Sequence, residues 1–357
     1  MKNSYNVAIV GATGIVGSMA LSILEERQFP INKLFLIASK RSVGEVLTFK
    51  NQPYLVEDLT EFDFKQTDIC FFCTSNDISA EYAPKAAALG NVVIDKSSYF
   101  RYAKEVPLVV PEVNEGVLKK YLRKKKNIIA NPNCSTIPIV VALKPIYDAV
   151  GISRINIATY QSVSGSGKDA VTELAEQTAL LLNGRPIRPK VYSQQIAFNV
   201  LPHCDELQEN GYTKEEMKIV WEIQKILDDK KIAINPTAVR VPVFYGHSAA
   251  VHIETKEKLS ASQAHDLLAK ATGVKLMTGK HQYPSPVHDA TGKDDVFVGR
   301  LREDLSHKKG LNLWVVTDNL RKGAALNAVQ IAEKLVEYQK NDGHDTQHLA
   351  QFSLILY

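Results

Sequence analysis

A glycine-rich loop near the N-terminus constrains the fold of this 357-residue chain more than any other feature. Apolar residues 7–10 lead directly into GATGIVG, which begins at Gly11, and a helical stretch over residues 18–27 follows. Glycines permit a tight turn and let backbone N–H groups approach a phosphate at the helix N-terminus. Three glycines alone often mark only a turn, but a strand before them and a helix after them favour a dinucleotide site. The loop predicts a dinucleotide-binding turn between a strand and a helix at the start of the chain.

Short apolar runs and helical stretches alternate through the first third of the chain, which is typical of a parallel sheet covered on both faces. The strands expected in this α/β unit are residues 7–10, 34–38, 69–73, 92–94, 108–110 and 128–130. From Arg154 onward the runs are longer and partly alternate, which indicates a mixed or antiparallel sheet with helices on one side. The elements expected there are strands 155–160, 238–243 and 249–254 and a helix over 214–227.

The chain length and this change of pattern predict two packed domains. Residues 324–338 carry apolar side chains at helical spacing, so a long amphipathic helix is expected near the C-terminus. We expect a dinucleotide-binding domain over residues 1–133, a second domain of different construction over 134–323 and the amphipathic helix over 324–340. Residues 341–357 form a tail without an assigned structure.

The composition, with 45% hydrophobic and 23% charged residues, is that of an ordinary globular protein. A net charge of +4 is weak evidence for nucleic acid, and the basic run over residues 119–126 is interpreted as a solvated helix face. The N-terminus does not resemble a signal peptide, and no run approaches the roughly 20 apolar residues of a membrane helix. We therefore expect a cytoplasmic protein that binds neither nucleic acid nor membranes.

The four cysteines are too few for a disulfide framework. Cys70 and Cys73 have CxxC spacing, but they lie in an apolar run, and no second Cys or His pair stands at zinc-finger distance. We interpret them as core thiols and expect no metal site. Cys204 lies in Leu-Pro-His-Cys-Asp, which reads as an irregular loop, and is interpreted as a bystander.

Cys134 is the candidate nucleophile. An apolar strand leads into Asn-Pro-Asn-Cys-Ser-Thr, and a helical run begins at Ile137. A cysteine at a helix N-terminus faces the positive end of the helix dipole and unsatisfied N–H groups, which lower its pKa and can stabilise an oxyanion on its substrate. This is the setting of a reactive thiol.

His247 and Arg240 are the candidate partners of this thiol. His247 lies in Phe-Tyr-Gly-His-Ser, where Gly246 interrupts two strand-like runs, and taken alone it would be interpreted as a histidine that caps a turn. Arg240 stands seven residues earlier inside an apolar run, where a guanidinium needs a fixed anionic partner. The pair indicates an acid/base group beside an anion-binding group.

Four boxes in order over nearly the whole chain resemble the aspartate-semialdehyde dehydrogenase family: GATGIVG, the box around Cys134, Arg240 followed by His247, and the segment Trp314-Val-Val-Thr-Asp-Asn-Leu-Arg-Lys-Gly-Ala-Ala. The resemblance implies that residues 1–133 form a Rossmann domain completed by the helix over 324–340. It implies that residues 134–323 form a glyceraldehyde-phosphate-dehydrogenase-like α+β domain that is catalytic and forms the dimer, with a tetramer left open. It also implies reversible reduction of aspartyl phosphate by NADPH, with release of phosphate, on the way to lysine, threonine and methionine.

The resemblance also assigns the site residues. It makes Cys134 the nucleophile, His247 the acid/base and Gln161 the group that orients the acyl group. The implied substrate contacts are Arg240 to the carboxylate, Glu215 to the amino group, and Arg101, Lys218 and Asn133 to the phosphate. The implied cofactor contacts are Gly11, Thr13, Gly14, Ile15, Val16, Ser39, Arg41, Ser42, Ser75, Gly165 and Asn319. Glu215 and Lys218 are three residues apart, which places them on one helix face, although an ordinary surface ion pair has the same spacing.

The residues after the second expected strand predict the cofactor. An NAD enzyme commonly places an acidic residue there, but this chain has Ser39, Lys40, Arg41 and Ser42. Cations and hydroxyls suit a 2′-phosphate, so we expect NADP. The alternative is an exposed turn with two ordinary basic residues.

Three other functions were weighed. An N-acetylglutamyl-phosphate reductase would share the loop and the thiol but would not require Glu215 for a free amino group. A hydrolase with a Cys-His pair leaves the glycine loop without a purpose. A non-catalytic binding protein on this fold leaves Cys134 and His247 unexplained.

Overall fold

The computed structural model describes residues 4–122, 127–279 and 282–338. By their internal contacts these residues form two units, each described by itself below. One unit contains the residues up to Thr13, residues 17–131 and the chain from Asn327 onward, and the other contains Gly14–Val16 and Pro132–Leu326.

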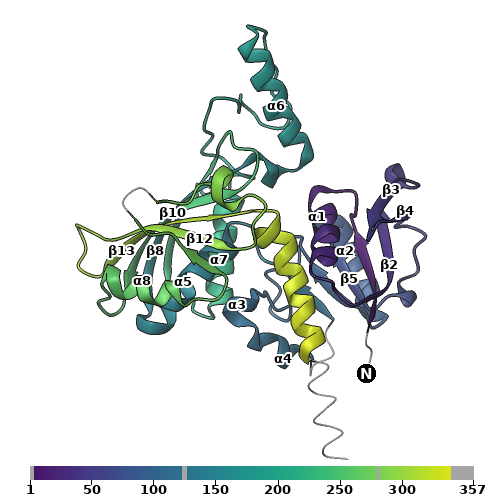
Figure 1. Ribbon diagram of the computed structural model, residues 1–357, viewed down its shortest axis with the longest axis horizontal. Coiled ribbons are helices and arrows are strands. Elements are labelled where there is room, and N and C mark those ends of the chain that lie inside the picture. Colours follow the sequence, from purple (N-terminus) through teal and green to yellow (C-terminus); the bar gives the residue numbers. More distant parts are fainter. Residues whose placement is uncertain (1–3, 123–126, 280–281, 339–357) are drawn as a thin grey trace, which may run out of the picture. The chain divides into compact units, whose positions relative to one another are not determined.

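The first unit has a seven-stranded sheet in the order β3-β4-β2-β1-β5-β6-β7 (Figure 1). All neighbours in it are parallel except β3 and β4, which form an antiparallel pair at one edge. The strands are β1 Tyr5–Val10, β2 Ile31–Ala38, β3 Val46–Phe49, β4 Gln52–Asp58, β5 Ile69–Phe72, β6 Val92–Asp95 and β7 Ile128–Ala130. The helices are α1 Ile15–Glu26, α2 Asn76–Ala88, α3 Pro111–Asn114, α4 Gly116–Leu122 and a helix over residues 326–338. The predicted Rossmann-type sheet is confirmed.

The helix over residues 326–338 belongs to this first unit, although it comes last in the described sequence. Arg27, which follows α1, forms an ion pair of 2.7 Å with Glu333, and the Asn327 amide donates to the Val109 carbonyl. The helix begins at residue 326, after a π-helical turn, η5, over Arg321–Ala325. The predicted start at 324 is therefore two residues early. Its predicted end at residue 340, the tail 341–357 and part of the basic run at 119–126 lie outside the described residues.

The predicted strand over residues 108–110 is wrong. Leu108 makes only an isolated bridge to Ala130. The Asn114 side chain accepts from the Val110 N–H and donates to the Leu108 carbonyl, and Asn327 occupies the Val109 carbonyl. The Val109 N–H still donates to the Ala130 carbonyl of β7, but side-chain amides take the other hydrogen bonds of this run, so it remains a loop.

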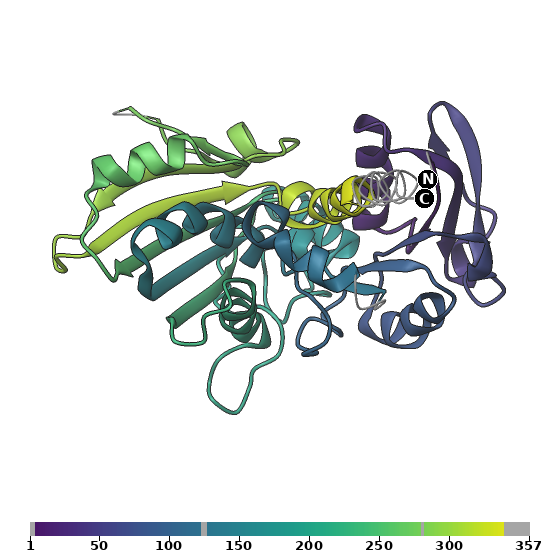
Figure 2. The same ribbon diagram turned by 90° about the horizontal axis from the view of Figure 1, so that it is seen from below.

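The second unit has a six-stranded mixed sheet in the order β11-β12-β13-β10-β8-β9 (Figures 1 and 2). Its strands are β8 Ile152–Gln161, β9 Ala233–Arg240, β10 His247–Thr255, β11 Val274–Leu276, β12 Val296–Glu303 and β13 Gly310–Thr317. Its helices are α5 Thr136–Val150, α6 Lys168–Leu182, α7 Lys214–Ile226 and α8 Ala261–Ala269, with short helical turns η3 Val163–Ser166 and η4 Pro286–Ala290. The expected mixed sheet is confirmed, and the strand predicted over 238–243 ends at Arg240, since Pro242 cannot donate to a ladder.

The two faces of this sheet differ. Along β10, Ala249, Val251 and Ile253 are buried, whereas Ala250 and His252 are only partly buried. Helix α5 packs against β10, β12 and β13 and contacts both α7 and α8. The helices thus cover one face, and the face that carries Ala250 is open in the chain by itself.

Candidate active site

Cys134 lies in the turn between β7 and α5, at the helix N-terminus that the sequence predicts. Ser135 is the N-cap residue of α5, and the Asn133 side-chain carbonyl accepts from the Ser135 N–H at 2.8 Å. None of the four cysteines forms a disulfide. Burial raises the pKa of Cys70 and Cys73 to about 12 and that of Cys204 to about 11, which agrees with their interpretation as unreactive thiols.

His247, the first residue of β10, faces the thiol. Its Nε2 atom lies 3.4 Å from the Cys134 Sγ atom. The Ser162 backbone N–H donates to its Nδ1 atom at 3.1 Å. A backbone N–H can only donate, so Nδ1 is the unprotonated nitrogen and Nε2 carries the hydrogen that points at the sulfur. Burial, reinforced by the charge of Arg240, lowers the pKa of His247 to about 3, so the ring is neutral.

Asn319 fixes the loop that carries Ser162 and His247. Its Oδ1 atom accepts from the Gly246 N–H at 2.9 Å and from the Ser162 hydroxyl at 3.1 Å, and its amide donates to Ser164 at 3.0 Å. The side chain is 1% exposed. The sequence points to Asn319 as a cofactor contact, and in the structure its polar atoms hold the histidine loop.

Helix α7 lies beside the nucleophile turn. Glu215 accepts from the Asn133 amide at 2.9 Å and from the Gln161 amide at 3.2 Å. One turn along, Lys218 forms an ion pair of 3.3 Å with Glu215. Burial acts to raise the pKa of Glu215, but Lys218 and the donated hydrogen bonds outweigh it and leave the pKa lowered. The structure therefore brings together four residues that the sequence nominated separately.

Glu222, two turns along α7, is a site residue that the sequence reasoning missed. It is fully buried, and its carboxylate accepts from the Asn133 backbone N–H at 2.6 Å. This bond holds the residue directly before the nucleophile. The signal was present, because residues 215, 218 and 222 share one helix face at spacings of three and four.

Arg240 ends β9 beside His247. Its Nη1 atom donates to the Ser162 carbonyl at 2.7 Å, and its buried Nε atom has no hydrogen-bond partner in the part of the chain that the structure describes. Within the same residues no carboxylate lies within ion-pair distance. A buried guanidinium with unused donors is prepared for a planar anion.

Gly165 faces both of these groups. A Cβ atom at this position would lie 2.9 Å from Arg240 Nη1 and 3.1 Å from His247 Nε2. Only glycine therefore fits here without displacing one of them, which accounts for a glycine that the family resemblance alone had assigned to the cofactor.

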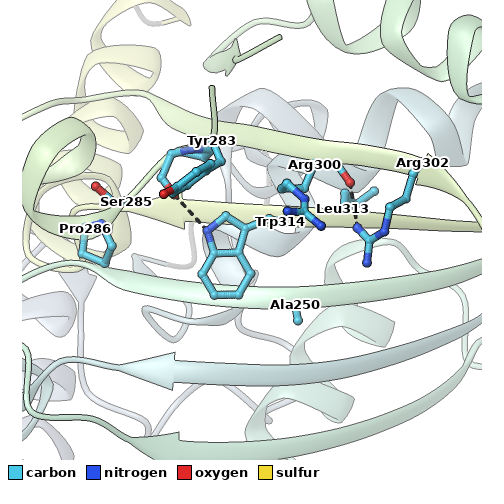
Figure 3. Close-up of a pocket in the computed structure, with 9 residues that line it drawn as sticks. Ala250, Tyr283, Ser285, Pro286, Arg300, Arg302, Leu313 and Trp314 are labelled. Atoms are coloured by element: carbon cyan, nitrogen blue, oxygen red, sulfur yellow. Dashed lines mark hydrogen bonds between the residues drawn. The ribbon is translucent and has the colours of Figure 1, made fainter. Parts of the chain in front are cut away.

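A pocket of about 690 Å³ opens beside Arg240. Among its lining residues are Ser166, Tyr192, Cys204 and Asp205. A second pocket, of about 330 Å³, lies on the open face of the six-stranded sheet, between Tyr283, Arg300 and Trp314 (Figure 3). It contains none of the predicted site residues, so the chemistry points to the first pocket.

The first unit carries most of the predicted cofactor residues. Gly11 has a φ of +84°, and a Cβ atom there would lie 2.4 Å from the Cys73 carbonyl oxygen. A Cβ atom at Gly17 would lie 2.1 Å from the Gly11 carbonyl oxygen, so this glycine allows the close helix–strand approach that the sequence predicts. Thr13 donates to the Ser42 hydroxyl at 3.3 Å.

The remaining predicted residues are placed as follows. Arg41 and Ser42 lie on a 3₁₀ turn, η1 Lys40–Ser42, directly after β2, where no residue is buried. Ser75 is the N-cap of α2, yet its hydroxyl makes no capping bond. Arg101 is buried and donates to the Lys96 carbonyl at 2.7 Å. Gly14, Ile15 and Val16 form the short segment counted with the second unit.

Known proteins resemble the chain over nearly its full length. Residues 6–121 match the model of the semialdehyde dehydrogenase NAD binding domain, and residues 143–322 match that of the semialdehyde dehydrogenase dimerisation domain. The aspartate-semialdehyde dehydrogenase of Legionella pneumophila is 60% identical over 94% of this chain and 96% of its own. The chain belongs to the aspartate-semialdehyde dehydrogenase family.

Solved structures of the family agree. The aspartate semialdehyde dehydrogenase II of Vibrio cholerae, in a crystal structure described as complexed with ASA, has a TM-score of 0.92 and 56% identity. That match covers 94% of this chain and 99% of the other. A probable aspartate-semialdehyde dehydrogenase from Pseudomonas aeruginosa has a TM-score of 0.90 at 34% identity. The predicted two-domain fold, the oxidoreductase class and the nicotinamide-binding domain are confirmed.

No helix among the described residues is long and apolar enough to cross a membrane. Among the same residues, no group of three or more His, Cys, Asp or Glu side chains could hold a metal ion.

Proposed function

We propose that the chain catalyses the reversible NADPH-dependent conversion of L-aspartyl 4-phosphate to L-aspartate 4-semialdehyde and phosphate, through a thioester on Cys134. The observation that carries this proposal is the Cys134–His247 contact of 3.4 Å at a helix N-terminus, next to the unused donors of Arg240. The product is the branch-point aldehyde from which lysine, threonine and methionine are made.

The first half of the reaction uses the thiol. The Cys134 thiolate attacks the acyl carbon, the carbon–oxygen bond to phosphate breaks, and phosphate leaves with the electron pair. The positive end of the α5 dipole stabilises the oxyanion, while the Asn133 side chain already accepts from the Ser135 and Thr136 N–H groups. Gln161 orients the acyl group, and Asn133, Lys218 and Arg101 hold the phosphate.

The second half uses the neutral histidine. NADPH supplies the hydride that reduces the thioester when it is bound. His247 is the acid/base partner in this step: its Nε2–H group, whose hydrogen already points at the site, donates a hydrogen bond to the oxyanion of the thiohemiacetal. The carbon–sulfur bond then breaks as the carbonyl re-forms, and the aldehyde leaves Cys134 as a thiolate.

Substrate selectivity is assigned to two charged residues. Arg240 binds the α-carboxylate with its unused donors, and Glu215, which is ionised and 6% exposed, binds the α-ammonium group. An N-acetylated acyl phosphate has no positive charge to offer Glu215. This favours the aspartate derivative over the N-acetylglutamyl one.

The proposal includes NADP as the preferred cofactor and the cytoplasm as the place of action. The absence of an acidic side chain over residues 38–42 supports NADP. Four cysteines without a disulfide fit a reducing compartment.

The test is a spectrophotometric assay of NADPH formation from aspartate semialdehyde, NADP and phosphate. Cys134→Ala should have no measurable activity, because no other group can form the thioester, whereas the matched control Cys204→Ala should retain most of it. Full activity in Cys134→Ala would refute the thioester. An N-acetylated substrate used as efficiently as the free amine would instead refute the selectivity assigned to Glu215.

A further inference from the structure

Asp205 forms an ion pair with Lys218, the residue that the proposed function assigns to the phosphate. The Lys218 Nζ atom lies 2.5 Å from the Asp205 carboxylate and 3.3 Å from the Glu215 carboxylate. The lysine side chain is 13% exposed, so it is largely withdrawn from water. Two carboxylates therefore already surround the ammonium group when no substrate is bound.

The two carboxylates differ in how firmly they are held. Glu215 is bound by Asn133 and Gln161, and its side chain is 8% exposed. Besides Lys218, the Asp205 carboxylate accepts only from the neighbouring Glu206 N–H, at 3.0 Å, among the hydrogen bonds of the described residues. Its side chain is 30% exposed and lines the 690 Å³ pocket together with Arg240.

The backbone around Asp205 is loosely held. Bridges from Leu201 to Arg240 and from Leu207 to Thr213 anchor the two ends of its loop. Between them, in the part of the chain that the structure describes, residues 202–205 make no backbone–backbone hydrogen bond. Asp205 itself has a φ of +68°, in the left-handed region that glycine, asparagine and aspartate enter more readily than other residues.

The charges require one anion to leave before another can enter. Burial acts to raise the pKa of Asp205, but the bond to Lys218 and its charge outweigh this and leave the pKa lowered, as for Glu215. Both carboxylates are thus ionised around one ammonium group. A phosphate dianion bound to Lys218 would add a third anion to this ammonium group, and Arg101 is the one other cation that the proposed function assigns to the phosphate.

We propose that the Asp205 carboxylate takes the place of phosphate at Lys218 in the unliganded enzyme, and that phosphate or the acyl phosphate displaces it. Asp205 is the carboxylate that yields, since it is the more exposed one and lies on the loosely held loop. The proposal rests on the proposed function, because it takes Lys218 as a phosphate ligand. Asp205 then acts through Lys218 and sets how much phosphate the enzyme needs.

The test compares Asp205→Asn with the parent enzyme. Asparagine keeps the shape and tolerates the positive φ, and it removes the charge that competes with phosphate. A like charge about 4 Å away costs about 1 kcal/mol even in bulk water, so the KM for phosphate should fall at least about fivefold. The KM for aspartate semialdehyde should stay within about twofold.

Two further variants support this comparison. Asp205→Gly removes the same carboxylate and also suits the positive φ, so it serves if the asparagine variant folds poorly. Glu206→Gln is the matched control, because it removes the neighbouring carboxylate, which pairs with Lys214 at 3.8 Å, and should leave the KM for phosphate unchanged.

A second readout does not depend on turnover. The phosphate concentration that half-protects Cys134 from iodoacetamide should fall by the same factor in the Asp205 variants. An unchanged or raised phosphate requirement in both variants would overturn the proposal, and would make Asp205 a residue that merely positions Lys218. If the parent enzyme itself forms no NADPH when phosphate is supplied, the proposed function fails instead.

Discussion

The Arg240 side chain has a buried hydrogen-bond donor without a protein partner among the described residues, which indicates that it binds a ligand. We expect Arg240→Lys to lose most activity although it keeps the charge. A single ammonium group cannot make the two parallel bonds of a guanidinium to a carboxylate, and a hydrogen bond to a charged group contributes about 1.5–3 kcal/mol. Catalytic efficiency with aspartate semialdehyde should therefore fall at least about tenfold. Near-normal kinetics in this variant would make Arg240 a structural residue.

The sequence predicts most of the residues that meet around Cys134, but it does not show the bonds between them. Cys134 was found because a helix N-terminus after a strand is a local pattern. Glu222 was not, since its bond to Asn133 spans 89 positions in the chain and arises only when α7 packs beside α5. The tautomer of His247 was equally hidden, because it depends on a backbone N–H 85 positions away.

The turn η1 after β2 should determine which cofactor the enzyme prefers. Arg41→Ala should weaken the use of NADP at least about tenfold and leave NAD nearly unchanged, because a guanidinium can hold a 2′-phosphate by charge-assisted bonds. Lys40→Ala is the matched control. The charge of Lys40 helps to lower the pKa of Asp58, after the bonds from Thr60, so Lys40 lies near that carboxylate and should matter less.

The measurement is catalytic efficiency with both cofactors in the parent and the two variants. Equal losses with NADP and NAD in Arg41→Ala would show that Arg41 supports the turn and does not read the phosphate.

Elements with a strong local pattern were predicted well. The strands at the centre of the first sheet were found because each is an unbroken apolar run. The β3–β4 edge was missed, since Val46 and Leu55 are exposed and the strands lack a continuous buried face. Residues 108–110 were predicted as a strand but form a loop, because an apolar, buried run does not show which groups its backbone bonds to.

The open face of the six-stranded sheet is the surface through which we expect the protein to dimerise. Ala250 lies opposite Ala158 on β8 and Trp314 on β13, and Tyr160 is 37% exposed nearby. Small and aromatic residues on a flat face suit a self-complementary contact, and this region falls in the segment that matches a dimerisation domain. We expect two copies to pair through this face.

Ala250→Arg should therefore convert the dimer to a monomer in light scattering at micromolar concentration. A charge buried without a partner costs about 3–5 kcal/mol, which is a loss of at least about a hundredfold in the dimerisation constant. Leu305→Arg is the matched control, because Leu305 is fully exposed in the turn after β12 and should leave the dimer intact. A dimer that persists in Ala250→Arg would place the contact elsewhere.

The bond from Ser162 to His247 has a consequence for how this enzyme can change by mutation. The donor that sets the tautomer is a main-chain amide, which every amino acid except proline supplies. Codon changes at position 162 can therefore alter the hydroxyl contacts with Asn319 while the protonation pattern of the imidazole is inherited unchanged. The tautomer of the histidine therefore depends on the backbone conformation at Ser162, and it persists as long as the chain leaves β8 in the same direction.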